Sequence, residues 1–449
     1  MFLKAGIACV LSMALPGIVS AKEFVPVFGV NVESHSNATR GNSQSPLPKR
    51  SDTIVTPYIG LNFSETVDKV NAEMAFRLER QVYTEGSFDD QNFLSIDGFL
   101  DYEVVPGRFI WATEDSASTR RIILQDPATP DNLQTFNVFT TGPDLFFTRG
   151  VNEIIVKGRI GDVHYSDQLA DNNRLIGSVA LRRPVSEVST VGLNASASLI
   201  RFQQDFQVDY DIVSLLTRYD RETPWGSIGL EGGYNLIDFE NGVSDEAPVI
   251  QGSLVVGGKE GSANSLTFTA SQKFSDPALD VFDPAYTRLF NVQGVGVVDT
   301  NEKAGTGASR ERRGEVAFEH YGDLYGIKLF GYYQDLDRPV DLQQSQLDKG
   351  AGINAGLALS ENVNVWASAL ASRSDFVNIE VGNGLGAGEP VHVDGRNVAA
   401  GINWQVWQNL TFAAGVRRDQ EKSNSVQRRF TDDIVFMSLQ YQGESQQRE

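Results

Sequence analysis

Alternation of apolar and polar residues in many short segments is the feature that most restricts the fold of this chain. In residues 70 to 83, Met74 and Leu78 fall in one phase of the alternation, whereas Glu73 and Arg77 fall in the other. Successive side chains of a β-strand point to opposite faces of the sheet. The chain offers no helical segment and no long apolar run that could cover an apolar sheet face. We therefore predict a closed barrel that has lipid outside and water inside.

The number and spacing of these segments predict an all-β fold, a large antiparallel transmembrane β-barrel. We count twenty candidate strands and expect about 18 to 20, since single-chain bacterial barrels usually have an even number of strands. Residues 108 to 117 are the segment for which a loop excursion is the main alternative. Tight connections, such as Pro106 and Gly107, alternate with long ones, such as residues 277 to 310. Outer-membrane barrels have short periplasmic turns and longer extracellular loops, so both termini are expected in the periplasm of a Gram-negative bacterium.

The first 21 residues have the composition of a signal peptide. Lys4 precedes an apolar stretch over residues 5 to 19, and a small-x-small ending closes at Ala21. A membrane anchor is the alternative, but the apolar stretch is too short to span a bilayer. We expect cleavage before Lys22 and export from the cytoplasm.

Removal of this leader would leave a single domain. We expect one barrel over residues 22 to 442, followed by a short polar periplasmic tail over residues 443 to 449. Cys9, the only cysteine of the chain, lies within the leader. The mature chain then has no disulfide, no thiolate nucleophile and no cysteine metal site, and we expect no cofactor.

The two phases of the alternation differ in chemistry along the whole chain. Ile59 and Leu359 belong to an apolar phase that would contact lipid, whereas Asn397 belongs to a polar phase that would line a wet lumen. Trp225 and Trp407 lie beside tight turns, where an interfacial aromatic girdle would sit. Ordinary aromatic packing is the alternative for either residue alone.

Charged and aromatic residues in the lumen phase are the candidate contacts of a cargo. The cations could form a ladder for an acidic polymer, and the aromatic rings could stack on sugar rings. Acidic residues such as Glu73 and Glu231 share this phase, so a mixed lumen would suit weakly charged sugars. Filling of the barrel interior is the alternative role for each residue. The candidates are Arg77, Lys157, Arg159, Arg182, Lys273, Lys328 and Arg417 among the cations, and Tyr58, Tyr83, Tyr332 and Trp366 among the aromatic residues.

A barrel of this size needs a constriction. A strand spacing near 4.8 Å and a tilt near 40° give a backbone diameter of roughly 35 to 40 Å, and an unplugged lumen of that width would leak. The longest loop, residues 277 to 310, either folds inward or projects outward. Its aspartates lack the glycine turn and distal glutamate of a calcium loop, so we expect no metal. The candidate constriction residues are Asp280, Asp283, Tyr286, Arg288 and Phe290.

The sequence gives no sign of an enzyme. Barrels that are enzymes generally rely on histidine or paired carboxylates at a defined rim. The four histidines, His35, His164, His320 and His392, are scattered and form no recognisable Ser-His or Asp-His arrangement in the sequence.

The net charge of the chain is strongly negative. The formal charge of −20 becomes −21 without Lys4. We expect no nucleic-acid partner, and we interpret the acidic outer loops as contacts, through divalent ions, with lipopolysaccharide.

Two segments near the N-terminus carry a resemblance to a known family. The first is FVPVFGV, residues 24 to 30, which leads into ESHSN, residues 33 to 37. The second is SDTIVTPYIGL, residues 51 to 61. In pattern and order, over most of the mature chain, the protein resembles the β-barrel porin family found with exopolysaccharide gene clusters, the EpsL-like and VpsM-like proteins.

This resemblance implies an outer-membrane conduit for a secreted polysaccharide. Such a conduit works with a periplasmic polysaccharide-export protein and an inner-membrane synthesis system, and the family has no catalytic residues to transfer. A general or substrate-specific small-solute porin shares the fold and is the alternative function. A surface-anchoring barrel that acts through its outer loops is a third class.

The ends of the predicted barrel bear on its partners. The first strand begins so close to the expected cleavage site that no plug domain of a TonB-dependent transporter is expected before it. The last strand, residues 432 to 442, looks like the terminal signal that the barrel-assembly machinery recognises during insertion into outer-membrane lipid. A polar tail follows Tyr441, whereas that signal usually ends the chain with an aromatic residue.

Overall fold

The structure is a computed structural model that describes most of the chain. The described residues are 23–44, 48–121, 129–166, 170–205, 207–257, 263–276, 308–337, 345–377, 390–425 and 429–444. The expected leader and the five candidate constriction residues, Asp280, Asp283, Tyr286, Arg288 and Phe290, lie outside these ranges, as does most of the expected tail.

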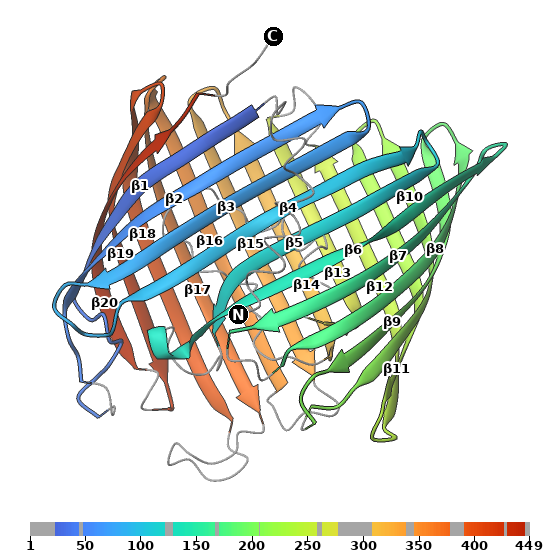
Figure 1. Cartoon of the computed structure of the whole chain (residues 1–449). Coiled ribbons are helices and arrows are strands. Elements are labelled where there is room, and N and C mark those ends of the chain that lie inside the picture. Colours follow the sequence, from blue (N-terminus) through green and yellow to red (C-terminus); the bar gives the residue numbers. More distant parts are fainter. Residues whose placement is uncertain are drawn as a thin grey trace.

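Twenty antiparallel strands form one closed sheet, in which each strand pairs with its neighbours in sequence and β20 pairs with β1 (Figure 1). The first ten are β1 Glu23–His35, β2 Asp52–Val67, β3 Val70–Tyr83, β4 Gln91–Val105, β5 Phe109–Arg121, β6 Leu133–Arg149, β7 Asn152–Tyr165, β8 Asn172–Ser186, β9 Ser189–Phe202 and β10 Tyr210–Thr223. The others are β11 Gly226–Phe239, β12 Ser244–Gly257, β13 Asn264–Ser275, β14 Ser309–Tyr321, β15 Tyr325–Asp337, β16 Ser345–Ser360, β17 Val363–Val377, β18 Val391–Trp407, β19 Leu410–Ser423 and β20 Phe430–Gln442.

This architecture confirms the predicted fold class and the count of twenty. The segment for which a loop was the alternative lies in β5, which pairs with β6 along its whole length and with β4 over residues 109 to 117. A short 3-10 helix, η1 Pro130–Asn132, precedes β6. No helix in the described ranges has the length and hydropathy needed to cross a bilayer.

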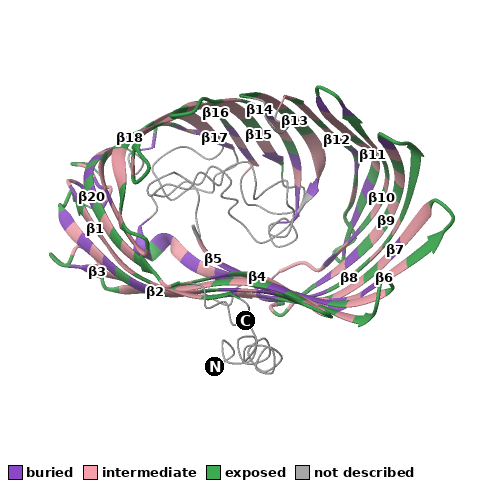
Figure 2. Cartoon of the chain, turned by 90° about the horizontal axis from the view of Figure 1, so that it is seen from above, coloured by how far each residue is buried: buried purple, intermediate pink, exposed green. Residues whose placement is uncertain are grey.

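The barrel wall has an apolar outer face and a polar inner face. Seen along its axis, the barrel is a flattened oval, and burial alternates along each strand (Figure 2). Ile59 is 52% exposed and Leu359 59% exposed on the outside, whereas inward-facing Asn397 is 8% exposed. The exposed side chains of the outer face are aliphatic and aromatic over strand after strand. Such a face is stable against lipid tails, and the closed sheet satisfies the backbone without water.

Exposed aromatic rings gather at one end of the barrel. Trp225 and Trp407 flank tight turns there, and Trp407 is 70% exposed. Tyr321 and Tyr325, on either side of another tight turn, are exposed as well. Amphipathic rings at this height are typical of the headgroup region of a membrane. The start of β1 and the end of β20 lie at the same end as these turns.

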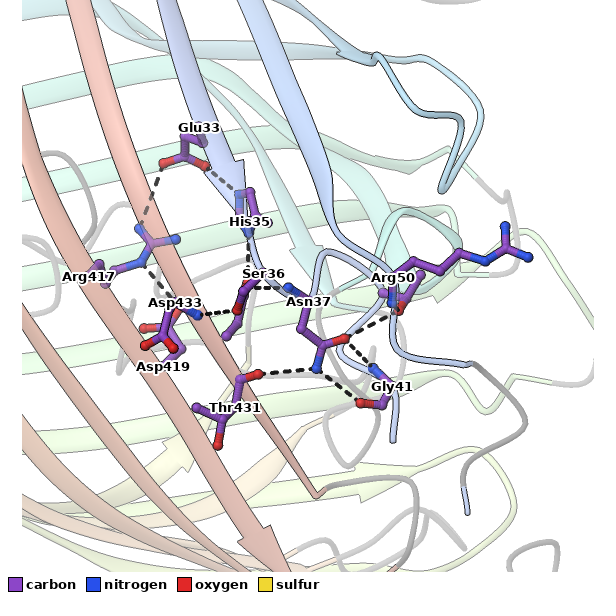
Figure 3. Close-up of polar contacts among 12 residues, drawn as sticks. Glu33, His35, Ser36, Asn37, Gly41, Arg50, Arg417, Asp419, Thr431 and Asp433 are labelled. Carbon is purple, nitrogen blue, oxygen red and sulfur yellow. Dashed lines mark hydrogen bonds and ion pairs between the residues drawn. The ribbon is translucent and has the colours of Figure 1, made fainter. Parts of the chain in front are cut away.

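The seam between β1 and β20 closes the barrel, and it is shorter than its neighbours. It pairs residues 27 to 35 of β1 with residues 434 to 442 of β20, whereas β1 pairs with β2 along its whole length. At the long-loop end, where this backbone ladder stops, the β1–β2 connection bonds to β20 instead. Ser36 N donates to Asp433 O at 2.9 Å, and Asn37 Nδ2 donates to Thr431 O at 3.3 Å (Figure 3).

A buried carboxylate holds the long-loop end of the seam together. Asp432 is fully buried and accepts hydrogen bonds from the His35 ring, at 2.7 Å, and from Asn37 N, at 2.8 Å. Nearer the tight-turn end, inward-facing Arg417 lies 3.2 Å from Asp419 and 3.9 Å from Glu33, so charges also pair across the seam (Figure 3). These side-chain contacts extend the closure beyond the backbone ladder.

We expect Asp432→Ala to lower the free energy of unfolding by about 3 kcal/mol or more, because it leaves buried donors without an acceptor. Urea unfolding of the barrel in lipid vesicles measures the change. Asp433→Ala is the matched control: Asp433 pairs with Arg418 on the outer surface, where both side chains are more than half exposed. Its loss should cost less than about 1 kcal/mol. Equal losses in the two variants would contradict the role of the buried carboxylate.

Candidate functional site

The lumen is the candidate functional site, and acidic neighbours pair with most of its predicted cations. Arg77 Nε lies 3.0 Å from Glu79, and Lys328 lies 3.0 Å from Glu319. Arg417 pairs across the seam, as described above. These ion pairs lie within the wall, so their cations do not form an uncompensated ladder.

The other predicted cations lie in the same inward phase. Lys157 and Arg159 share one buried carboxylate, that of Asp144, with Lys157 at 3.2 Å. Lys273 is opposite Glu311 in the β13–β14 register, and Arg182 is opposite Glu153 in the β7–β8 register. Arg182 is exposed near the tight-turn end and has no ion pair within 4.0 Å among the described residues. The structure therefore places all the predicted cations on the inner wall but distributes them around it.

The four predicted aromatic residues divide into two kinds. Tyr58 and Tyr83 are buried: the Arg77 guanidinium lies 3.8 Å from the Tyr58 ring centroid, and Tyr83 packs edge-on against Phe88. Neither ring presents a face to the lumen. Tyr332 and Trp366 face inward and are only partly buried.

Glycines on neighbouring strands create the space that these rings occupy. Trp366 on β17, Gly401 on β18, Gly415 on β19 and Phe436 on β20 are consecutive register partners. The Trp366 and Phe436 rings lie over the two glycines, with centroids 6.2 Å apart and planes 22° apart. A Cβ atom at Gly401 would lie 2.9 Å from Trp366 Cζ2. The glycines thus let the rings lie flat on the wall.

The same arrangement fixes two rings of β15. Tyr332 lies over Gly350, its register partner on β16, and Phe330 lies over Gly352. Phe330 is also partly buried, and it shares the inward phase of Tyr332. We call Phe330, Tyr332 and Trp366 the aromatic strip, in which the first two rings are on β15 and the third is two strands away on β17. Phe330 was absent from the sequence prediction, although its phase relative to Tyr332 could have identified it.

A buried polar cluster at the long-loop end joins β8 and β10 to the residue that follows β13. Arg174 on β8 donates to both carboxylate oxygens of Asp276, at 2.8 and 3.1 Å, and Tyr210 on β10 donates to the same carboxylate. All three side chains are buried, and Arg174 Nε also donates to Asn172. We call Arg174, Tyr210 and Asp276 the latch.

The latch requires the end of β13 to leave the barrel wall. Asp276 directly follows β13, and five strand spacings, or about 24 Å along the wall, separate β13 from β8. Two side chains cannot bridge that distance unless the chain bends into the lumen. The strand pairing is consistent with such a bend. The pairing of β13 with β12 ends at Gln272, whereas its pairing with β14 continues to Ser275.

Apolar packing accompanies this bend. Phe274 and Ala308, on the two sides of the β13–β14 connection, are buried in a cluster with inward-facing Ile200, Ile237 and Phe239. The base of the longest loop therefore folds inward, which answers the question that the sequence left open for this part. Residues 277 to 307 lie outside the described ranges, so the predicted constriction itself stays a prediction.

Sequence alternation could not reveal the latch, since its members lie on elements that are not neighbours in the wall. The described residues contain no group of three or more histidine, cysteine, aspartate or glutamate side chains placed to hold a metal ion.

Comparison with known proteins gives no family for this chain. No family model and no curated protein matches it. Among solved structures, the siderophore receptor PirA from Pseudomonas aeruginosa is 11% identical, with 94% of this chain and 80% of that chain covered and a TM-score of 0.46. A ferric enterobactin receptor variant, PfeA from the same organism, is 10% identical, covering 94% and 81%, with a TM-score of 0.48. The FrpB iron transporter from Neisseria meningitidis is 9% identical, covering 93% and 81%, with a TM-score of 0.46. These values assign no cargo to this chain.

The fit of Trp366 on the wall predicts the effect of a single methyl group. Gly401→Ala should lower the free energy of unfolding by about 1 to 3 kcal/mol, because the added Cβ would overlap Trp366 and the Ala414 carbonyl. Gly356→Ala is the matched control: Gly356 is the other register partner of Trp366, and a Cβ there meets no atom closer than 4.0 Å. Urea unfolding measures the free energy of unfolding of both variants. Equal decreases in the two variants would mean that the position of the Trp366 ring does not depend on Gly401.

The latch predicts a change in conductance. Arg174→Leu leaves the buried Asp276 with the Tyr210 hydroxyl but without its positively charged partner. This loss costs about 3 to 5 kcal/mol, so the bent end of β13 should leave its docked position. The single-channel conductance of the purified barrel in planar bilayers should then rise. Arg201→Leu is the control, because Arg201 pairs with Asp211 on the outer side of the same rim and is half exposed. An unchanged conductance in Arg174→Leu would show that the latch does not limit the opening.

Proposed function

We propose that this barrel is an outer-membrane conduit through which an exopolysaccharide leaves the cell. The aromatic strip is the observation that carries the proposal. Phe330, Tyr332 and Trp366 present partly exposed rings to the lumen, and glycines hold these rings against the wall. Aromatic rings pack closely against the apolar faces of sugar rings. Rings that are already fixed lose little side-chain entropy when a cargo binds.

The charge of the lumen favours a neutral or weakly charged polymer as this cargo. Of the seven predicted cations, Arg77, Lys157, Arg159, Lys328 and Arg417 each lie within 4.0 Å of an acidic side chain. A strongly acidic polymer would have to compete with these carboxylates. A sugar chain rich in hydroxyl groups can instead accept from the cations and donate to the carboxylates.

We propose the following setting for such a conduit. The apolar outer face contacts outer-membrane lipid, and the barrel-assembly machinery inserts it. The end with the tight turns faces the periplasm, together with both termini, and receives the polymer from a periplasmic polysaccharide-export protein. The opposite rim faces lipopolysaccharide.

Deletion of the gene tests the proposal against the porin alternative. We expect surface polysaccharide to be lost, while the uptake of small solutes stays unchanged, because the cargo is the polymer. Staining of the polymer at the cell surface and solute uptake by the same cells are the two measurements. Normal polymer with reduced uptake would overturn the proposal and leave a small-solute porin.

The aromatic strip can be tested in the same cells. The double variant Tyr332→Ala and Trp366→Ala should reduce surface polysaccharide severalfold at an equal amount of inserted barrel. Tyr333→Ala is the matched control, since Tyr333 neighbours Tyr332 in sequence but faces outward and is exposed. Equal polymer in the double variant and the control would remove the strip from the proposal.

A further inference from the structure

The lumen wall contains a groove on the side of the barrel formed by β10 to β14. Its volume is about 240 Å³. Small side chains leave this space open, and the small residues that line the groove include Gly229, Ser253 and Ser271. The volume lies just below the roughly 300 Å³ at which small-molecule sites usually begin. One or two sugar rings are of suitable size, with the remainder of a longer ligand lying in the open lumen.

Register places the lining side chains of the groove in one row across five strands. Arg218 on β10 pairs with Glu231 on β11, followed by Gln251 on β12, Ser271 on β13 and Arg313 on β14. Register partners lie on the same face of a sheet. The row crosses four strand spacings, or about 19 Å.

The alternate residues of the same strands confirm that this row faces inward. Ile250 and Phe268 are exposed on the apolar outer face, and each of them neighbours a groove residue in sequence. A second inward row lies beside the first, with Asp220 and Thr269 at its two sides.

The polar groups of the groove alternate between donors and acceptors. At one end, Arg218 Nε and Nη2 donate to Asp220 at 2.7 and 3.0 Å, and both side chains remain about half exposed. At the other end, Arg313 lies 3.5 Å from Glu315. Hydroxyl and amide groups of Gln251 and its neighbours occupy the middle. Each end thus carries a compensated pair, and Lys273, which also lines the groove, is opposite Glu311 in the β13–β14 register.

We propose that this groove is a binding subsite for an uncharged sugar segment. The inference rests on the proposed function and adds the class of sugar that the lumen recognises. Sugar hydroxyl groups both donate and accept, so they match a surface that offers both kinds of partner side by side. The spacing of the partners, one per strand, is comparable to the length of a sugar ring. A carboxylate-bearing sugar would be attracted by Arg218, Lys273 and Arg313. Each of these cations already has an acidic residue beside or opposite it, namely Asp220, Glu311 and Glu315 respectively.

The experiment fills the groove and measures sugar binding to the purified full-length barrel. Ser271→Tyr places a ring on the groove floor, whereas Ser178→Tyr places the same ring on the inner face of β8, outside the groove. Saturation-transfer NMR of the barrel in detergent gives the Kd for maltohexaose, an uncharged probe, and for an oligogalacturonate with the same number of rings. Heat-modified mobility on a gel confirms that each variant is folded.

We expect maltohexaose to bind the unmodified barrel more tightly than oligogalacturonate does. Ser271→Tyr should raise the Kd for maltohexaose severalfold, while Ser178→Tyr leaves it unchanged. Equal effects of the two substitutions, no effect of Ser271→Tyr, or tighter binding of the acidic probe would each overturn the inference. The measurement needs no export machinery, so its outcome is independent of the deletion experiment that tests the proposed function.

Discussion

A backbone that crosses lipid must satisfy all of its N–H and C=O groups within the protein, and closure of the sheet between β1 and β20 meets this need. Every other feature depends on that closure. The outer face can be apolar because no second layer has to cover it, and the inner face can be polar because the ring of strands encloses water. The short seam explains why Asp432, His35 and Asn37 form a buried polar cluster where the backbone ladder ends.

Within the closed wall, small residues decide which side chains remain available to a cargo. Gly350, Gly401 and Gly415 make room for rings that lie flat, and Ser271 lies in a groove between two compensated ion pairs. Most of the predicted lumen cations already have acidic partners in the wall. The proposed recognition therefore relies on ring faces and on hydrogen-bonding groups rather than on net charge. This division is consistent with a polymer that moves past many weak contacts.

Alternation along single strands predicted the fold well, because the period of two that places Ile59 outside and Asn397 inside is a local property. It gave twenty strands and the inward phase of the cations and rings. It could not give the partners of those residues, since cross-strand neighbours such as Arg218 and Glu231 depend on the register between strands. The latch could not be predicted from the sequence even with a known register, because Asp276 contacts a strand that is not a neighbour of β13 in the wall.

The latch also has a consequence for the order of assembly. Arg174 and Asp276 are 102 residues apart in sequence, and His35 and Asp432 are 397 residues apart. Contacts between distant residues form late, after the intervening chain has been placed. The end of β13 can therefore dock against β8 only after β9 to β13 have joined the sheet. During insertion the barrel therefore passes through a stage in which the end of β13 is not yet docked, and that stage ends once β8 to β13 are all in the wall.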